Sequence, residues 1–214
     1  MRPIAGLCLL VLLLLPAAPT AARRGGEDAA ASTAGMLLVA EERLSDPNFD
    51  RTVVLLVEHG ADGALGLVLN RPSELPLGEV LDRWAPRAAA PGAMFLGGPV
   101  QPSAVICLAA GEAPGTDDDP VLTPTSVPGV SLVDLDGDPD VVHPGIEVRC
   151  FAGYAGWGGG QLEAEIDEGS WFVVDPLPAD PFVSRPSRLW REVLARQPGP
   201  LARYALYPSN PMVN

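Results

Sequence analysis

Polar side chains that could carry chemistry stand in two pairs, each at the end of an apolar run. Glu58 and His59 form the first pair, and Asn70 and Arg71 form the second. A carboxylate beside an imidazole suits acid–base chemistry on a small substrate. Because adjacent residues of a strand point to opposite faces, Glu58 and His59 act together only if their strand ends before them. Otherwise His59 opens a turn and Glu58 is paired or solvated, which is the interpretation that we favour.

A second group of polar and aromatic side chains surrounds a run of three glycines. Tyr154 and Trp157 precede the run or border it, and Gln161 follows it at the start of an expected helix. A phosphate site at this helix start is disfavoured, because the glycine run lacks a P-loop lysine and carboxylates follow it closely. We predict that the two groups form one ligand-binding site. Its residues are Glu58, His59, Asn70, Arg71, Tyr154, Trp157 and Gln161.

Several kinds of site are disfavoured by what the sequence lacks. His59 and His143 lie far apart in the chain and have no partners at metal-ligand spacing. No serine stands in a G-x-S-x-G elbow, and nothing near Cys107 or Cys150 marks a reactive thiolate. The aspartates at 117–119 lack the spacing of a calcium loop, so a solvated loop is expected there. We therefore expect no metal, no cofactor and no complete catalytic constellation.

The elements that must position these residues are mostly strands. Apolar runs at Thr52–Val57 and Ala64–Leu69 flank a turn that contains glycine and aspartate, which predicts a β-hairpin. Gly97-Gly98 follows another strand, where a tight turn or bulge is favoured over close approach of a ligand to the backbone. The other predicted strands are Met36–Ala40, Ala93–Leu96, Val105–Ala109, Val130–Leu135, Glu147–Ala152 and Trp171–Val174. The predicted helices are Leu77–Trp84, Gln161–Glu168 and Ser187–Arg196, with a short helical connection near Val141.

Length and charge limit the possible partners. The chain has 214 residues, carries a net charge of −13 and contains no lysine, so its 14 basic residues are all arginines. An acidic surface repels phosphate backbones, which makes general nucleic-acid binding unfavourable. The C-terminal segment is locally basic and keeps DNA binding open as an alternative, although no recognition-helix pattern accompanies it. Its arginines are Arg185, Arg188, Arg191, Arg196 and Arg203.

Residues 1–34 are expected to be a signal-like or disordered extension of a single domain at residues 35–214. The apolar run Ile4–Leu15 follows Arg2 and precedes small residues, as in a cleaved export signal, but a start codon assigned too far upstream would look the same. The run is too short for a comfortable membrane span. Cys107 and Cys150 could form a disulfide, but we favour two separate core cysteines.

Three stretches in this order resemble the YqgE/AlgH family of largely uncharacterised bacterial proteins. They are DPNFDRTVVLLVEHGADGALGLVLNRP, MFLGGPV and FAGYAGWGGGQLEAEIDEGSWFVV. The resemblance covers Gly35 to about Pro208. It implies an α+β fold in which a bent, branched, mixed but mainly antiparallel sheet closes into a pseudo-barrel with three or four flanking helices. It also implies a cytoplasmic protein, with export as the alternative, and one branch of the family is described as transcriptional regulators of alginate synthesis.

Four functional interpretations follow from these observations. The leading one is a non-enzymatic regulatory or small-ligand-binding protein whose partner is an unknown small molecule or protein. The alternatives are an enzyme that uses His59 and Glu58 on a small substrate, and a DNA-binding transcriptional regulator. A fourth interpretation is structural, with the motif residues stabilising a sharply bent sheet and Asn70 capping a turn. The shared-site hypothesis predicts that Glu58, His59 and Asn70 lie close to Tyr154, Trp157 or Gln161.

Overall fold

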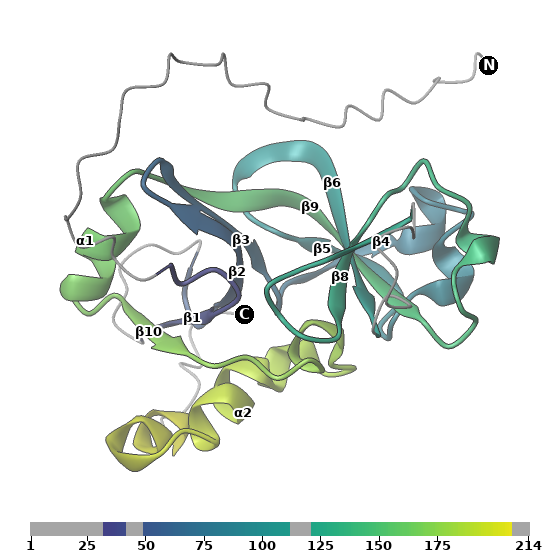
Figure 1. Ribbon diagram of the computed structural model, residues 1–214. Coiled ribbons are helices and arrows are strands. Elements are labelled where there is room, and N and C mark those ends of the chain that lie inside the picture. The colour runs from purple at the N-terminus through teal and green to yellow at the C-terminus, as the bar shows by residue number, and fades with distance from the viewer. Residues whose placement is uncertain (1–31, 42–48, 112–120, 207–214) are drawn as a thin grey trace, which may run out of the picture.

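A computed structural model describes residues 32–41, 49–111 and 121–206 (Figure 1). Two sequence predictions lie outside these residues: the export signal near the N-terminus and the solvated loop at 117–119. Asp46-Pro47, an Asp-Pro pair from which a turn before the hairpin is expected, also lies outside them. Within the described part of the chain, no helix is long and apolar enough to cross a membrane.

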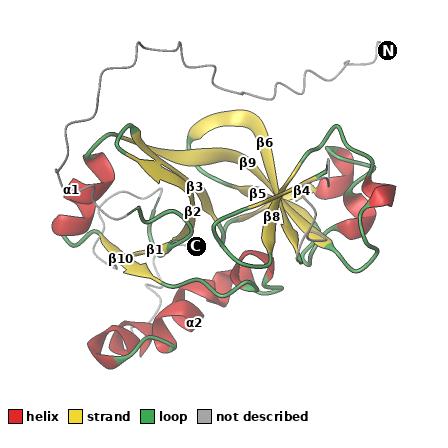
Figure 2. Ribbon diagram, viewed as in Figure 1, coloured by secondary structure: helices red, strands yellow, loops and turns green. Residues whose placement is uncertain are grey.

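Within these described ranges, ten strands form one branched sheet that curls into a half-barrel, with helices packed outside it (Figure 2). The main path runs β10-β1-β2-β3-β9-β6-β8-β7, and β4 and β5 form a side branch. All pairings are antiparallel except that of β5 with β9, so the predicted strand-rich α+β class is confirmed. The strands are β1 (Leu37–Ala40), β2 (Val53–Gly60), β3 (Gly63–Val68), β4 (Pro72–Pro76), β5 (Ala93–Leu96), β6 (Val100–Ala110), β7 (Leu122–Pro124), β8 (Val130–Val133), β9 (Glu147–Gly158) and β10 (Trp171–Val174).

The sheet branches along β9, the longest strand. One edge of β9 pairs with β6, while the other edge pairs with β5 near its middle and with β3 near its end. The backbones cross closely at the branch, where a Cβ on Gly97 or Gly98 would strike the backbone of β9. Gly153 has φ +69, and its Cβ would lie 2.6 Å from the carbonyl oxygen of Gly98. The double glycine is therefore structural, which agrees with the interpretation favoured from the sequence.

Both faces of the sheet formed by β1, β2 and β3 are covered. Helix α2 (Leu189–Ala195) packs on one face and buries Trp190, while α1 (Gln161–Asp167) packs on the other and buries Leu162. Because neither face meets water over the buried part of these strands, that part is a continuous apolar run in the sequence rather than an alternating one. The predicted helices at Gln161–Glu168 and Ser187–Arg196 are confirmed, and the second starts slightly later than expected.

The predicted amphipathic helix at Leu77–Trp84 is instead a pair of short turns, η1 (Leu77–Glu79) and η2 (Ala85–Arg87). Leu77 and Trp84 are buried as their spacing predicted, but Val80 is 41% exposed. The segment is shorter than the length at which a helix becomes stable by itself, and Pro86 breaks it. The remaining 3₁₀ segments are η3 (Pro139–Val141), η4 (Asp180–Phe182), η5 (Pro186–Arg188) and η6 (Gly199–Leu206).

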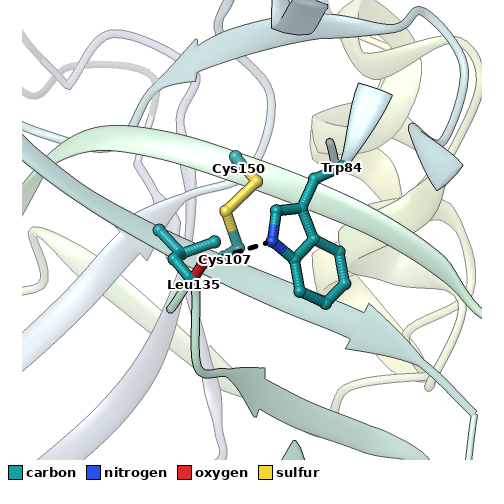
Figure 3. Close-up of a disulfide and its surroundings, with 4 residues drawn as sticks. All are labelled: Trp84, Cys107, Leu135 and Cys150. Atoms are coloured by element: carbon teal, nitrogen blue, oxygen red, sulfur yellow. Dashed lines mark hydrogen bonds between the residues drawn. A yellow bond between two sulfur atoms is a disulfide. The ribbon is translucent and has the colours of Figure 1, made fainter. Parts of the chain in front are cut away.

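Cys107 and Cys150 form a disulfide between β6 and β9 (Figure 3). The preference for two separate core cysteines is therefore wrong, although both residues are buried as expected. The sequence shows both as strand residues but not the register of their strands. Because Cys107 stands directly opposite Cys150 in the antiparallel pairing, their sulfur atoms meet.

Candidate functional site

A β-bulge in β2 decides where Glu58 and His59 point. Leu56 pairs with Gly66 of β3, whereas Glu58 pairs with the next residue, Leu65, so β2 has one extra residue at this point. The strand continues to Gly60, and the two side chains therefore point to opposite faces. Glu58 is exposed, as expected, whereas the bulge turns His59 towards the face that α1 covers.

His59 is held at both ring nitrogens and its side chain is only 5% exposed. Nδ1 accepts the backbone N–H of Thr33 at 3.0 Å, and Nε2 lies 2.8 Å from Glu163 Oε1. Since a backbone N–H only donates, Nδ1 carries no proton and Nε2 donates to the carboxylate. A histidine tied in this way has no ring nitrogen facing a substrate, which argues against an enzyme that uses the His59–Glu58 pair.

The same contact affects Glu163, which lies on α1. The backbone N–H of Glu163 and the imidazole of His59 both donate to this carboxylate, and they hold its pKa below the usual value of 4.5. Thr33 belongs to the segment that the sequence assigned to the N-terminal extension, yet it contacts the hairpin directly. The folded contacts thus begin before residue 35.

Asn70 and Arg71 lie at the opposite end of the hairpin from His59. Asn70 Oδ1 accepts the N–H of Val53 at 3.0 Å, and its Nδ2 donates to the carbonyl of Arg51 at 2.9 Å. Arg71 donates to the carbonyl of Asp50. The β2–β3 register separates these residues from His59 by about five strand positions, or roughly 17 Å at ~3.3 Å per residue. The structure therefore does not bring Asn70 and Arg71 to His59, and Asn70 bridges backbone groups as the structural interpretation expected.

The two aromatic candidates on β9 separate from each other. Tyr154 packs against the core on the α2 side, whereas Trp157 lies in the cluster beneath α1. Their side chains leave opposite faces because the two residues are three positions apart on one strand. Of the seven predicted site residues, Trp157 and Gln161 come together at one pocket. His59 lies on the same side of the sheet, and it contacts α1 through Glu163.

The pocket lies between α1, β9 and the start of β10 and has a volume of about 260 Å³. Its aromatic walls pack against one another: the ring centroids of Phe49 and Trp171 are 5.4 Å apart, and those of Trp157 and Trp171 are 6.0 Å apart. The residues that line it are Phe49, Pro99, Gly156, Trp157, Gln161, Glu165, Ser170 and Trp171.

Glu165 organises the polar side of this pocket. Its Oε2 accepts the indole N–H groups of Trp157 at 2.9 Å and Trp171 at 2.8 Å. Its Oε1 accepts the side-chain amide of Gln161 at 3.0 Å, and the amide oxygen of Gln161 in turn accepts the N–H of Gly158. These bonds fix both indole rings and the Glu165 carboxylate relative to the helix along one side of the pocket.

Phe49, Trp171 and Glu165 were missing from the predicted site. Glu165 did carry a signal, since it shares a polar helix face with Gln161 in the sequence pattern. No sequence pattern predicts Phe49 and Trp171 at the pocket, because their positions depend on how β10 pairs with β1 and on where the chain enters β2. Among the residues that the structure describes, no group of three His, Cys, Asp or Glu side chains could hold a metal ion.

One arginine of the C-terminal segment is committed to a buried ion pair. Arg196 binds Asp180 through both of its terminal nitrogens, at 2.7 and 2.6 Å, and the Asp180 side chain is 4% exposed. This ion pair ties α2 to the turn at Asp180–Phe182 and commits Arg196 to the fold.

Residues 37–202 match the AlgH-like family. The chain belongs to this family. It is 47% identical over 180 residues to the UPF0301 protein of Streptomyces coelicolor, covering 83% of this chain and 93% of that one. A UPF0301 protein of Mycobacterium tuberculosis is also 47% identical, with 80% and 86% covered.

Solved structures agree with this assignment. A crystal structure of a protein from Corynebacterium diphtheriae is 33% identical with a TM-score of 0.73, covering 86% of this chain and 95% of that chain. The solution structure of the AlgH protein from Pseudomonas aeruginosa is 28% identical with a TM-score of 0.58, covering 87% and 100%. The expected family and its half-barrel fold are thus confirmed.

Proposed function

We propose that this protein is a non-enzymatic, regulatory protein that binds a small ligand in the pocket beside α1. The observation that carries the proposal is Glu165, which holds Trp157, Trp171 and Gln161 around one concave space. Aromatic walls with a few convergent polar groups are the usual composition of a small-molecule site. Ser170 and Phe49 complete the wall on the side of β10 and β2.

Two observations set this proposal above the alternatives. His59 is buried and bonded to backbone, and Glu58 points away from it, so the acid–base pair expected of an enzyme is not assembled. The basic C-terminal segment gives little support to DNA binding, since Arg196 is committed to Asp180. Regulation through a bound small molecule needs neither feature.

Native mass spectrometry of protein purified from its own cells tests the proposal. We expect a retained small molecule that is lost from a Ser170→Leu variant, because the larger side chain fills the pocket. Ser187→Leu makes the same substitution at an exposed position of η5 and should keep the molecule. Equal retention by both variants, or no retained molecule in either, would contradict a ligand site here.

The cellular compartment remains a prediction. The family resemblance favours the cytoplasm, whereas the Cys107–Cys150 disulfide favours the exported alternative, because cytosolic thiols are kept reduced. The mass of the mature chain distinguishes the two: loss of the segment ending near Ala22 would establish export.

A further inference from the structure

In the part of the chain that the structure describes, the carboxylate in the pocket beside α1 pairs with no cationic side chain. Every hydrogen bond that the Glu165 carboxylate accepts within the described residues comes from a neutral donor: two indoles and one side-chain amide. Among the described residues that line the pocket there is no arginine or histidine. From this arrangement we propose that the ligand is a small organic cation, whose ammonium or guanidinium group pairs with Glu165. The inference rests on the proposed function, since it names the chemical class of the ligand of that same site.

The hydrogen bonds leave room for such a group. A carboxylate has about four acceptor positions on its two oxygens, and the described contacts use three of them. The position that remains is on Oε1, because Oε2 already accepts both indoles. Glu165 is half-buried, so a cation that reaches it is partly shielded from water and the pair is stronger than an exposed one.

The aromatic walls suit the same class of ligand. Indole and phenyl rings attract ammonium and guanidinium groups, and cages of such rings beside a carboxylate recognise organic cations. Phe49, Trp157 and Trp171 line the same pocket as this carboxylate. At about 260 Å³ the pocket is slightly smaller than the ~300 Å³ at which drug-sized sites begin, so the cation is a small one.

The charges around the pocket also favour a cationic ligand. Helix α1 and its C-cap carry only acidic charged residues, which are Glu163, Glu165, Asp167 and Glu168. The chain as a whole has a net charge of −13. Such a field raises the local concentration of cations and excludes anions, and the effect weakens as salt is added.

A matched set of probes tests the charge of the ligand. Choline and methylguanidinium are the cations. The neutral probe is 3,3-dimethylbutan-1-ol, the carbon analogue of choline, and the anion is 3,3-dimethylbutanoate. The chain has four tryptophans, so its nitrogen–proton correlation spectrum contains four indole signals. We expect a cation to shift the Trp157 and Trp171 signals saturably, while the Trp84 and Trp190 signals stay in place because those residues lie in other parts of the core.

A pair of charge-removing variants locates the effect. Glu165→Gln should weaken the affinity for methylguanidinium about ten- to a hundredfold, which is the contribution of a charged hydrogen bond. Glu168→Gln removes the same charge from an exposed position at the end of the same helix and should change the affinity less than about twofold. Unchanged Trp84 and Trp190 signals in Glu165→Gln would show that the variant still folds.

The outcomes separate the inference from the function on which it rests. If the neutral or anionic probe binds the pocket as tightly as a cation, the cation class is wrong while the ligand site stands. If no cation shifts either pocket indole, the inference fails, and native mass spectrometry decides the ligand site independently. Salt-insensitive binding of choline, or equal affinity of wild type and Glu165→Gln, would also overturn the pairing with Glu165.

Discussion

His59 donates to Glu163 over 2.8 Å, although 104 positions separate them in the chain. The bond joins the tip of the β2–β3 hairpin to the helix that carries Glu165. It also depends on the bulge in β2, without which His59 would point to the other face of the sheet. A residue that resembles a catalytic base in the sequence thus positions the helix of the proposed ligand site.

Replacement of Glu163 by glutamine should remove an acid-sensitive part of the stability. The pKa of Glu163 is lowered in the folded protein by its own backbone N–H and by His59, so the charged carboxylate stabilises the fold above the usual pKa of 4.5. This contribution is lost as the pH falls through the lower native pKa. Because the side chain is 39% exposed, we expect less than about 1 kcal/mol at neutral pH. Urea unfolding of wild type and Glu163→Gln between neutral and acidic pH measures it, and a difference that grows in acid would contradict the prediction.

Glu165→Ala should destabilise the protein and loosen both indole rings of the pocket. The substitution leaves the N–H groups of two buried indoles, Trp157 and Trp171, without their acceptor, and each unsatisfied buried donor costs about 1–3 kcal/mol. Chemical unfolding should show a loss of about 2 kcal/mol or more, with a weaker near-ultraviolet dichroism signal. Glu165→Gln keeps an acceptor and should lose less. Equal losses in the two variants would show that the hydrogen bonds do not carry the effect.

The sequence predicts the individual elements better than their meeting points. The hairpin, the two α-helices and the family can all be predicted from the sequence, because apolar periodicity and motif order are local features. The direction of the His59 side chain cannot be predicted from the sequence, since one extra residue in β2 reverses the face to which this side chain points. The pairing of Cys107 with Cys150 is hidden for a similar reason, as it depends on the register between two distant strands.

The candidate site shows the same division. Trp157 and Gln161 were predicted because both border the glycine run that precedes α1, so their proximity is local. Asn70 and Arg71 were grouped with His59 because all three follow apolar runs. The two strands of a hairpin are antiparallel, however, so the residues that follow them lie at opposite ends.

Removal of the disulfide should destabilise the fold without changing it. The bond closes a loop of 43 residues, for which the chain-entropy relation gives about 4 kcal/mol at 25 °C. A Cys107→Ala, Cys150→Ala variant should lose about 2–4 kcal/mol in urea unfolding. The comparison must be made in the absence of reductant, and dithiothreitol should bring wild type close to the variant. No effect of reductant on wild type would show that the cysteines are not paired in solution.

Gly98→Ala should be among the most damaging single-methyl substitutions in this chain. Gly98 lies where the branch of the sheet brings two backbones together, and a Cβ there would strike the backbone of Tyr154 and Ala155, which cannot move aside as a flexible side chain can. We expect a loss of about 3 kcal/mol or more, or failure to fold, because β3, β5 and β9 all meet at this crossing. Gly60→Ala is the matched control: it adds the same methyl group in a strand where no atom lies within 4 Å of the new Cβ, and it should change the stability by less than about 1 kcal/mol. If thermal unfolding shows similar losses for both variants, close approach of the backbones does not explain the double glycine.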